Sequence, residues 1–168
     1  KLSLDEPAER YVPELKSLRY ASADAPRITV RHLMTHSAGF PEDNPWGDQQ
    51  LDATEDAFSA MMRGGIPFST VPGTNYEYSN YGFAILGRIV TNVSGMPYAR
   101  YLRERILNPL GMRNTTLETR DVDPNRLAYG YRLQDDKWLL EPPLPDGAFG
   151  VMGGMVTTPA DLSRWVAF

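Results

Sequence analysis

The sequence predicts a mainly α-helical domain with one small antiparallel β-hairpin. Apolar residues recur at helical spacing in several short segments, each bounded by a capping residue or by glycine and proline. Two short strand-like runs, 127–133 and 137–141, flank three turn-forming residues and predict the hairpin. The 168 residues suffice for one domain, and the fourteen prolines favour short elements joined by stiff loops.

Capping residues mark the first two predicted helices. Thr29 precedes a helical apolar pattern over 30–36, and Gly39 follows where the end of a helix favours a positive φ angle. Thr54 starts a second helix, which the glycine pair 64–65 ends. A polar loop that contains Trp46 is expected to connect the two helices.

The later helices follow the same logic. Segment 79–93 is apolar nearly all round, which predicts a central buried helix. Pro97 suits the first turn of its successor, which Asn108 and the following proline end. Thr158 is expected to cap the last helix, with Asp161 three residues later in a capping-box arrangement.

Composition and charge exclude several classes of function. The net charge of −4 comes without a basic stripe, which argues against a nucleic-acid partner. No apolar run approaches the ~18 residues of a membrane span. The chain has no cysteine, which excludes disulfides, thiolate catalysis and zinc–thiolate sites and leaves the compartment open.

The two histidines, His32 and His36, lie four residues apart and could in principle face one metal ion. The glutamate of the zinc-protease pattern is replaced by Leu33, so we expect no metal site and interpret His36 as a helix-end residue. Ser37 and Gly39 superficially resemble a nucleophile elbow. The first glycine of that motif is missing, and the end of a helix explains both residues better.

The string Tyr78-Ser79-Asn80 stands between a Pro-Gly turn and the buried helix. On its own it has a purely structural interpretation. The tyrosine ring could pack while its hydroxyl forms a hydrogen bond, and Asn80 could cap the first turn of the helix.

Four passages change that interpretation, because together and in this order they resemble the class C β-lactamase and penicillin-binding-protein family. Related family VIII esterases and D-amino-acid peptidases share the pattern. The passages are ITVRHLMTHSAGF (28–40), PGTNYEYSNYGFAILGRIV (72–90), YARYLRERILNPLGM (98–112) and GGMVTTPADLSRW (153–165). The second contains the family's Tyr-x-Asn triplet as Tyr78-Ser79-Asn80. The resemblance implies the helical lobe of the β-lactamase/transpeptidase-like α+β fold.

The resemblance also implies acyl transfer through a serine acyl-enzyme, with Tyr78 and Asn80 as catalytic residues. A serine hydroxyl is a weak nucleophile and needs a base within hydrogen-bond reach. Tyr78 would be that base and the proton donor to the leaving group. Asn80 would hydrogen-bond the family's lysine and the amide of the substrate. The resemblance implies no metal and no organic cofactor.

The chain departs from the family pattern in two motifs. No serine is followed three residues later by a lysine, so the Ser-x-x-Lys nucleophile motif is absent. The family's Lys-Thr-Gly or His-x-Gly strand is absent as well. We therefore interpret residues 1–168 as a single partial domain, with the nucleophile and the flanking sheet supplied by sequence outside it, and expect no catalysis by this chain alone.

The resemblance places further residues at the substrate pocket, namely Trp46, Phe149, Gly153 and Gly154. The glycines could permit close approach of a ligand or form a flexible turn, and Trp46 could form a pocket wall or cover the helices. The substrate would be a β-lactam, an ester or a D-amino-acid peptide. Family resemblance favours a periplasmic or secreted location and leaves a cytoplasmic one open.

A different class of function stays open from the sequence alone. The chain could belong to a relative that binds a ligand or partner without catalysis, or be an isolated helical module. A separated helical lobe would expose apolar surface, so the fragment is expected to be able to form a homodimer.

Overall fold

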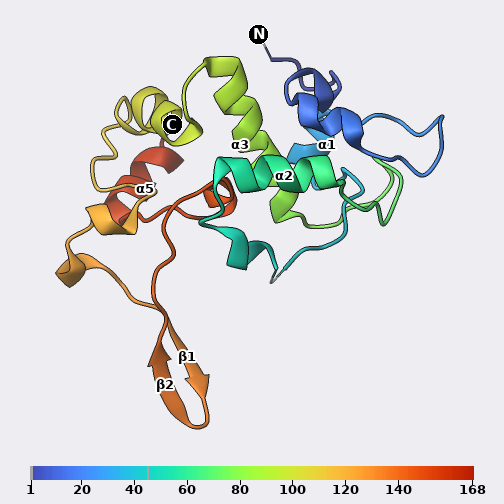
Figure 1. The fold of residues 1–168 in the computed structure, drawn as a ribbon. Coiled ribbons are helices and arrows are strands. Elements are labelled where there is room, and N and C mark those ends of the chain that lie inside the picture. The colour runs from blue at the N-terminus through green and yellow to red at the C-terminus, as the bar shows by residue number, and fades with distance from the viewer. Residues whose placement is uncertain (1, 45) are drawn as a thin grey trace.

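The computed structural model describes residues 2–44 and 46–168 of the chain. Strands β1 (Tyr131–Gln134) and β2 (Lys137–Leu140) pair as an antiparallel hairpin. The α-helices are α1 (Val30–Met34), α2 (Glu55–Gly64), α3 (Asn80–Ser94), α4 (Tyr98–Leu102), which continues as a π-helical turn (Arg103–Leu107), and α5 (Pro159–Val166) (Figure 1). Short 3-10 helices cover Ala8–Arg10, Pro13–Ser17, Gly47–Gln50, Thr119–Asp121, Pro124–Arg126 and Gly150–Met152. The predicted fold class, mainly helical with a small hairpin, is confirmed.

Helix α3 is the central element, as its apolar sequence predicts. The Ser79 hydroxyl caps it by accepting the Gly82 N–H at 3.0 Å, and Gly95 ends it in the left-handed conformation at φ 72°. Its residues Ala84 and Ile85 are fully buried. Helices α1 and α4 and the 3-10 helix Gly150–Met152 pack against it, so α3 is held on several sides.

An aromatic cluster forms the part of the core nearest the start of α3. Phe58 of α2, Tyr81 of α3 and Phe149 meet edge to face, with ring centroids 5.2 to 5.7 Å apart. Edge-to-face pairs of this kind contribute about 0.5–1.5 kcal/mol each beyond the area they bury. The cluster therefore fixes the first turn of α3 relative to α2.

The structure corrects the predicted end of the first helix. Helix α1 stops at Met34, two residues before the predicted end, because His36 adopts a left-handed conformation with φ 52°. Gly39 has the predicted positive φ, 83°. A non-glycine residue in this conformation is uncommon, so the surroundings of His36 must stabilise it.

The predicted hairpin is present but its first strand is shorter. Gln134 belongs to β1, and only Asp135 and Asp136 form the turn, both with positive φ of 51° and 58°. Two such residues in succession form the type I′ turn that matches the twist of paired strands, and aspartate tolerates this conformation.

Helix α5 begins as predicted but without a reciprocal capping box. The Thr158 hydroxyl accepts the Asp161 N–H at 3.2 Å. The Asp161 carboxylate instead accepts from the Asn114 N–H at 2.6 Å and from the Thr115 hydroxyl at 2.9 Å. It therefore ties α5 to the segment after α4. Across the described part of the chain, no helix has the length and hydrophobicity that crossing a bilayer requires.

Candidate active site

The Tyr78-Ser79-Asn80 triplet lies at the first turn of α3. Ser79 is the N-cap of the helix and Asn80 its first residue, so the capping role falls to Ser79 rather than Asn80. Asn80 is buried, with 2% of its surface exposed, while Tyr78 is half-buried. The triplet thus spans the N-terminus of α3, with Tyr78 just before the helix and partly exposed.

Asp43, in the loop after α1, holds this turn in place. Its Oδ1 accepts the Asn80 N–H at 2.8 Å, and its Oδ2 accepts the Tyr81 N–H at 2.7 Å. The Ser79 hydroxyl lies 3.3 Å from the same Oδ2 and donates to it. A carboxylate is favourable here because the free N–H groups at a helix N-terminus carry partial positive charge. Asp43 therefore fixes the backbone that carries the triplet.

His36 positions Tyr78 from the other side. Its Nδ1 accepts the Ser79 N–H at 3.1 Å, and its ring packs between Tyr78, at 4.5 Å between centroids, and Phe83, at 4.8 Å. The imidazole must be neutral to accept this bond. Burial lowers the pKa of His36, an effect that the nearby Asp43 carboxylate partly opposes, so the neutral form is favoured.

The Asn80 side chain is held by the loop that contains Trp46. Its amide Nδ2 donates to Asn44 Oδ1 at 2.5 Å. Gly47 packs directly on Asn80, since a Cβ at Gly47 would lie 2.6 Å from the Asn80 Cβ. Only glycine allows this close approach. An amide has two N–H groups and one carbonyl oxygen, so Asn80 retains hydrogen-bonding capacity beyond the bond to Asn44.

The two histidines accept hydrogen bonds from different backbone N–H groups. The Nδ1 of His32 accepts the Thr29 N–H at 3.3 Å, while that of His36 accepts from Ser79. Among residues 2–44 and 46–168, no group of three or more His, Cys, Asp and Glu side chains is arranged to hold a metal ion.

Trp46 and Phe149 lie on the same side of the molecule as the start of α3. Trp46 is 42% exposed, stacks on Tyr81 with ring planes 19° apart, and contacts Phe149 edge to face at 5.9 Å. Phe149 is fully buried, so in this structure it supports Trp46 and Tyr81 rather than forming an exposed surface. Of these two expected pocket residues, Trp46 is the one a ligand could touch directly.

Gly153 and Gly154 do not lie at the start of α3 but line a separate surface hollow. They share it with Tyr98 and Met155 and with Val90 of α3. Val90 is ten residues beyond Asn80, which corresponds to about 15 Å along a helix. Gly153 is exposed and has open space beside it, whereas Gly154 packs against Gly150. The structure therefore groups these glycines with the later part of α3.

Sequence reasoning missed Asp43 and, as a positioning residue, His36. Asp43 contacts Asn80 across 37 residues and His36 contacts Ser79 across 43. A polar residue in a loop gives no indication of so distant a partner. For His36 the sequence offers one local signal, since it lies in the passage 28–40 that resembles the β-lactamase and penicillin-binding-protein family.

Comparison with known proteins identifies the family. The family model described as Beta-lactamase matches residues 1–168, and the chain belongs to this family. It is 28% identical over its whole length to protein flp of Staphylococcus aureus strain MW2, and 31% identical over 62% of its length to penicillin-binding protein 4* of Bacillus subtilis strain 168.

Solved structures agree with this assignment. The octameric penicillin-binding protein homologue from Pyrococcus abyssi superposes with a TM-score of 0.77 over 98% of this chain at 27% identity, matching 38% of that chain. A class C β-lactamase gives 0.72 over 98% at 27% identity, matching 42% of that chain. A D-stereospecific amidohydrolase from Streptomyces gives 0.71 over 98% at 25% identity, matching 52% of that chain. The fold is thus that of the β-lactamase/transpeptidase group.

The chain spans 34% of the length of protein flp and 25% of penicillin-binding protein 4* in these matches. The resemblance of the four passages to the β-lactamase and penicillin-binding-protein family is confirmed.

Proposed function

We propose that this chain supplies the Tyr-x-Asn part of the active site of a serine hydrolase. The parent protein would cleave an amide, a β-lactam or an ester through a serine acyl-enzyme. Since no serine here is followed three residues later by lysine, the Ser-x-x-Lys motif would come from sequence outside residues 1–168. The observation that carries the proposal is the position of Tyr78. It is half-buried beside His36, immediately before the capped start of a buried helix.

In the proposed reaction, Tyr78 accepts a proton in the first half of acylation and donates the same proton in the second half. Its phenolate takes the proton of the serine hydroxyl as the serine oxygen bonds to the carbonyl carbon. The same proton then passes to the leaving nitrogen or oxygen as its bond to that carbon breaks. Water hydrolyses the ester that remains. A free tyrosine has a pKa of about 10, so a neighbouring lysine ammonium is needed to favour the phenolate.

Asn80 is proposed to orient the lysine and the substrate amide through its side-chain amide. The contact with Asn44 fixes the direction of that amide, which supports a positioning function. Trp46 is proposed as a pocket wall supported by Phe149, and Gly153 and Gly154 as a second boundary of the substrate region. The chain alone, without a nucleophile, is proposed to be inactive.

The test is Tyr78→Phe in the parent protein. This change keeps the ring that packs on His36 and removes only the hydroxyl. We expect the rate of acylation by a fluorescent penicillin, or of hydrolysis of a chromogenic ester, to fall by about 10²-fold or more, with little change in melting temperature.

Tyr76→Phe is the matched control. Tyr76 lies two residues away, also touches His36 edge to face, and is 68% exposed. Its variant should retain the wild-type rate. Unchanged turnover in Tyr78→Phe would show that the Tyr78 hydroxyl is only structural. Absence of turnover in the wild-type parent protein would instead favour a binding protein without catalysis.

A further inference from the structure

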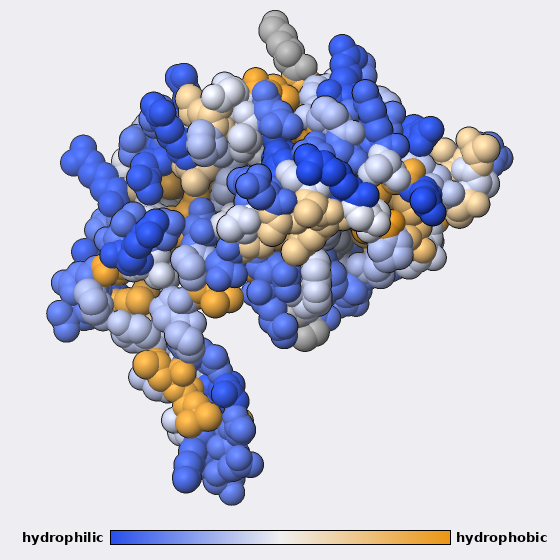
Figure 2. Space-filling view, viewed as in Figure 1, coloured by the Kyte–Doolittle hydropathy of each residue, from blue (hydrophilic) through white to orange (hydrophobic). Residues whose placement is uncertain are grey.

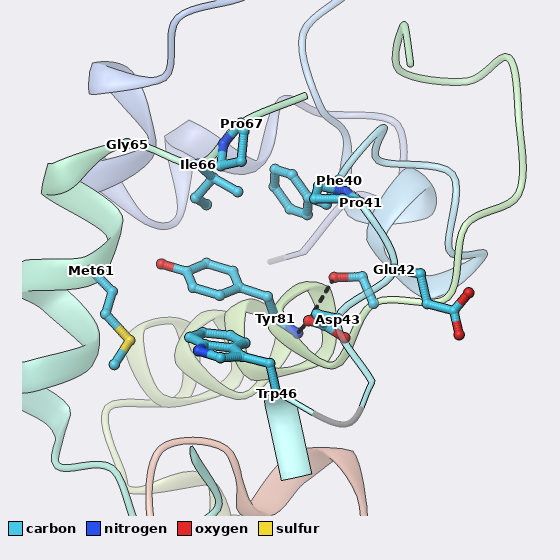
Figure 3. A pocket seen from close by; sticks show the side chains of 11 residues that line it. Phe40, Pro41, Glu42, Asp43, Trp46, Met61, Gly65, Ile66, Pro67 and Tyr81 are labelled. Atoms are coloured by element: carbon cyan, nitrogen blue, oxygen red, sulfur yellow. Dashed lines mark hydrogen bonds between the residues drawn. The ribbon is translucent and has the colours of Figure 1, made fainter. Parts of the chain in front are cut away.

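The segment 146–154 connects the two sets of residues that are proposed to border the substrate. Near its start, Phe149 contacts Trp46, which lines a hollow of about 460 Å³ beside the first turn of α3 (Figure 3). At its end, the glycine pair 153–154 lines the separate hollow of about 310 Å³. The 3-10 helix Gly150–Met152 lies between the two. The conformation of this one turn therefore sets the position of both boundaries relative to α3.

Two sides of this turn are held by close packing and a backbone hydrogen bond. Val151 packs directly on Gly87 of α3, because a Cβ at Gly87 would collide with the Val151 side chain. The Ala148 N–H donates to the Ala53 carbonyl, before α2, at 2.8 Å. These contacts fix the start of the turn against α3 and against the segment that leads into α2.

Asp146 and Tyr98 of α4 hold the turn from a third side. The Tyr98 hydroxyl donates to Asp146 Oδ1 at 2.9 Å. The pair packs on Gly150, because a Cβ there would collide with the carboxylate and lie 2.7 Å from the Tyr98 hydroxyl, so only glycine leaves room. The Gly150 carbonyl in turn accepts the N–H groups of Gly154 at 2.9 Å and Gly153 at 3.3 Å. The pair is thus linked through Gly150 to the glycine boundary.

The protonation of the two side chains favours this hydrogen bond. Burial, and after it the Asp146 charge, raise the pKa of Tyr98, so its hydroxyl keeps its proton and donates. Burial raises the pKa of Asp146, while the Tyr98 hydrogen bond acts to lower it and the Glu118 charge to raise it. A carboxyl group keeps an acceptor oxygen in either protonation state, so the bond persists at neutral pH.

We propose that Asp146 and Tyr98 are positioning residues for substrate binding, which they support by holding this turn through Gly150. The inference rests on the proposed hydrolase function, because it takes the turn as a border of the substrate region. A looser turn weakens the binding of the substrate and of the transition state alike, which raises KM and leaves kcat unchanged. Tyr78 is held by separate contacts, chiefly with His36, so its proton transfer is preserved.

The first test measures steady-state hydrolysis of a chromogenic ester by the full-length parent protein. Tyr98→Phe keeps the ring and removes the donor. We expect KM to rise about three- to tenfold, part of the worth of a hydrogen bond to a carboxylate, with kcat within about twofold of wild type. A variant that merely lowered the folded fraction would show the opposite pattern, a lower kcat at an unchanged KM.

Two variants of Asp146 separate the hydrogen bond from the charge. Asp146→Asn keeps an acceptor oxygen for the Tyr98 hydroxyl and should retain the wild-type KM. Asp146→Ala removes the acceptor and should raise KM as Tyr98→Phe does. Tyr101→Phe is the matched control, since Tyr101 lies on the same helix and lines the same hollow as the glycine pair. It should change neither constant.

The second test needs no turnover. Amide hydrogen exchange, read by mass spectrometry, should be about tenfold faster over 150–154 in Tyr98→Phe than in wild type, because the turn opens more often. Exchange at the start of α3 should stay the same, and Tyr101→Phe should match wild type throughout.

The outcomes distinguish this inference from the hydrolase proposal. Turnover with an unchanged KM in Tyr98→Phe would overturn the positioning role, and so would unchanged exchange over 150–154. An equal rise of KM in Asp146→Asn and Asp146→Ala would overturn the role of the hydrogen bond. Absence of turnover in the wild-type parent protein would refute the hydrolase proposal and, with it, the role of the pair in substrate binding.

Discussion

Asp43 organises the candidate active site by fixing the first turn of α3. It binds the Asn80 and Tyr81 N–H groups and receives the Ser79 hydroxyl. Each bond involves an ionised acceptor, and such bonds are shorter and stronger than those between neutral groups. The loop after α1 and the first turn of α3 are therefore expected to move as one unit.

His36 leads to a prediction about pH. Its pKa is lowered by burial, with the Asp43 carboxylate opposing, while Tyr76, Tyr78 and Phe83 pack around the ring. The unfolded chain titrates this group near pH 6.5 and the folded protein below that. Between the two values the unfolded state binds more protons, so the free energy of unfolding falls as pH falls. Stability is complete above about pH 6.5 and declines through the lowered pKa.

The matching variant is His36→Asn. Asparagine tolerates the left-handed conformation that His36 adopts and keeps an acceptor near the position of Nδ1, but it does not titrate. Urea unfolding at a series of pH values from 8 to 4.5 should show a shallower acid loss of stability in the variant. His32, whose pKa burial also lowers, should retain its own share of that loss. An unchanged pH profile would contradict the assignment.

At the scale of elements, Asp161 joins α5 to the segment after α4. It is 1% exposed and accepts from Asn114, Thr115 and, at 3.4 Å, Arg164. Burial acts to raise its pKa, but these hydrogen bonds and the Arg164 charge hold the pKa of Asp161 below its usual value. The resulting stability is present above about pH 4 and is lost as pH falls through the lowered pKa.

We predict that Asp161→Asn lowers the melting temperature of the parent protein by several degrees at neutral pH. The substitution keeps the shape but removes the charge that strengthens the contacts with Asn114 and Thr115. Differential scanning calorimetry is the measurement. Asp136→Asn is the control, since Asp136 is exposed and asparagine suits its positive φ. Equal melting of wild type and Asp161→Asn would remove the proposed link between elements.

The same elements show what local sequence can and cannot predict. Thr29, Thr54 and Thr158 cap helices as expected, because capping depends on neighbours two or three residues away. The end of α1 differs from the predicted end because the conformation of His36 depends on Ser79 and on aromatic rings distant in sequence. The triplet was found through resemblance, but Asp43, which holds it, acts through contacts that only folding brings together.

At the scale of the whole molecule, the hairpin stands away from the helices (Figure 1). Its register places Tyr131 opposite Leu140 and Leu133 opposite Trp138. These pairs share one face, because side chains alternate along a strand, and each of the four residues is more than half exposed. Figure 2 shows hydrophobic side chains gathered along the hairpin. Apolar cross-strand pairs of this kind usually pack on another surface.

This exposed face leads to the last prediction, that the isolated 168-residue chain self-associates through its hairpin. Both hairpin edges are unpaired in the described residues, and an unpaired edge beside an apolar face favours strand-to-strand contact between copies. Sedimentation velocity over a concentration series should detect a dimer. Replacing Leu133 and Trp138 together by threonine keeps the β-propensity but removes the apolar pair. It should weaken association about tenfold or more.

Arg132→Thr is the matched control, because Arg132 lies on the opposite face of the same strand. It should leave the dimer intact if the apolar face forms the contact. A chain that stays monomeric at every concentration would argue against association through the hairpin. A dimer that Arg132→Thr weakens as much as the double variant would instead assign the contact to the strand edges. A monomeric chain would leave the apolar face of the hairpin to pack within the parent protein.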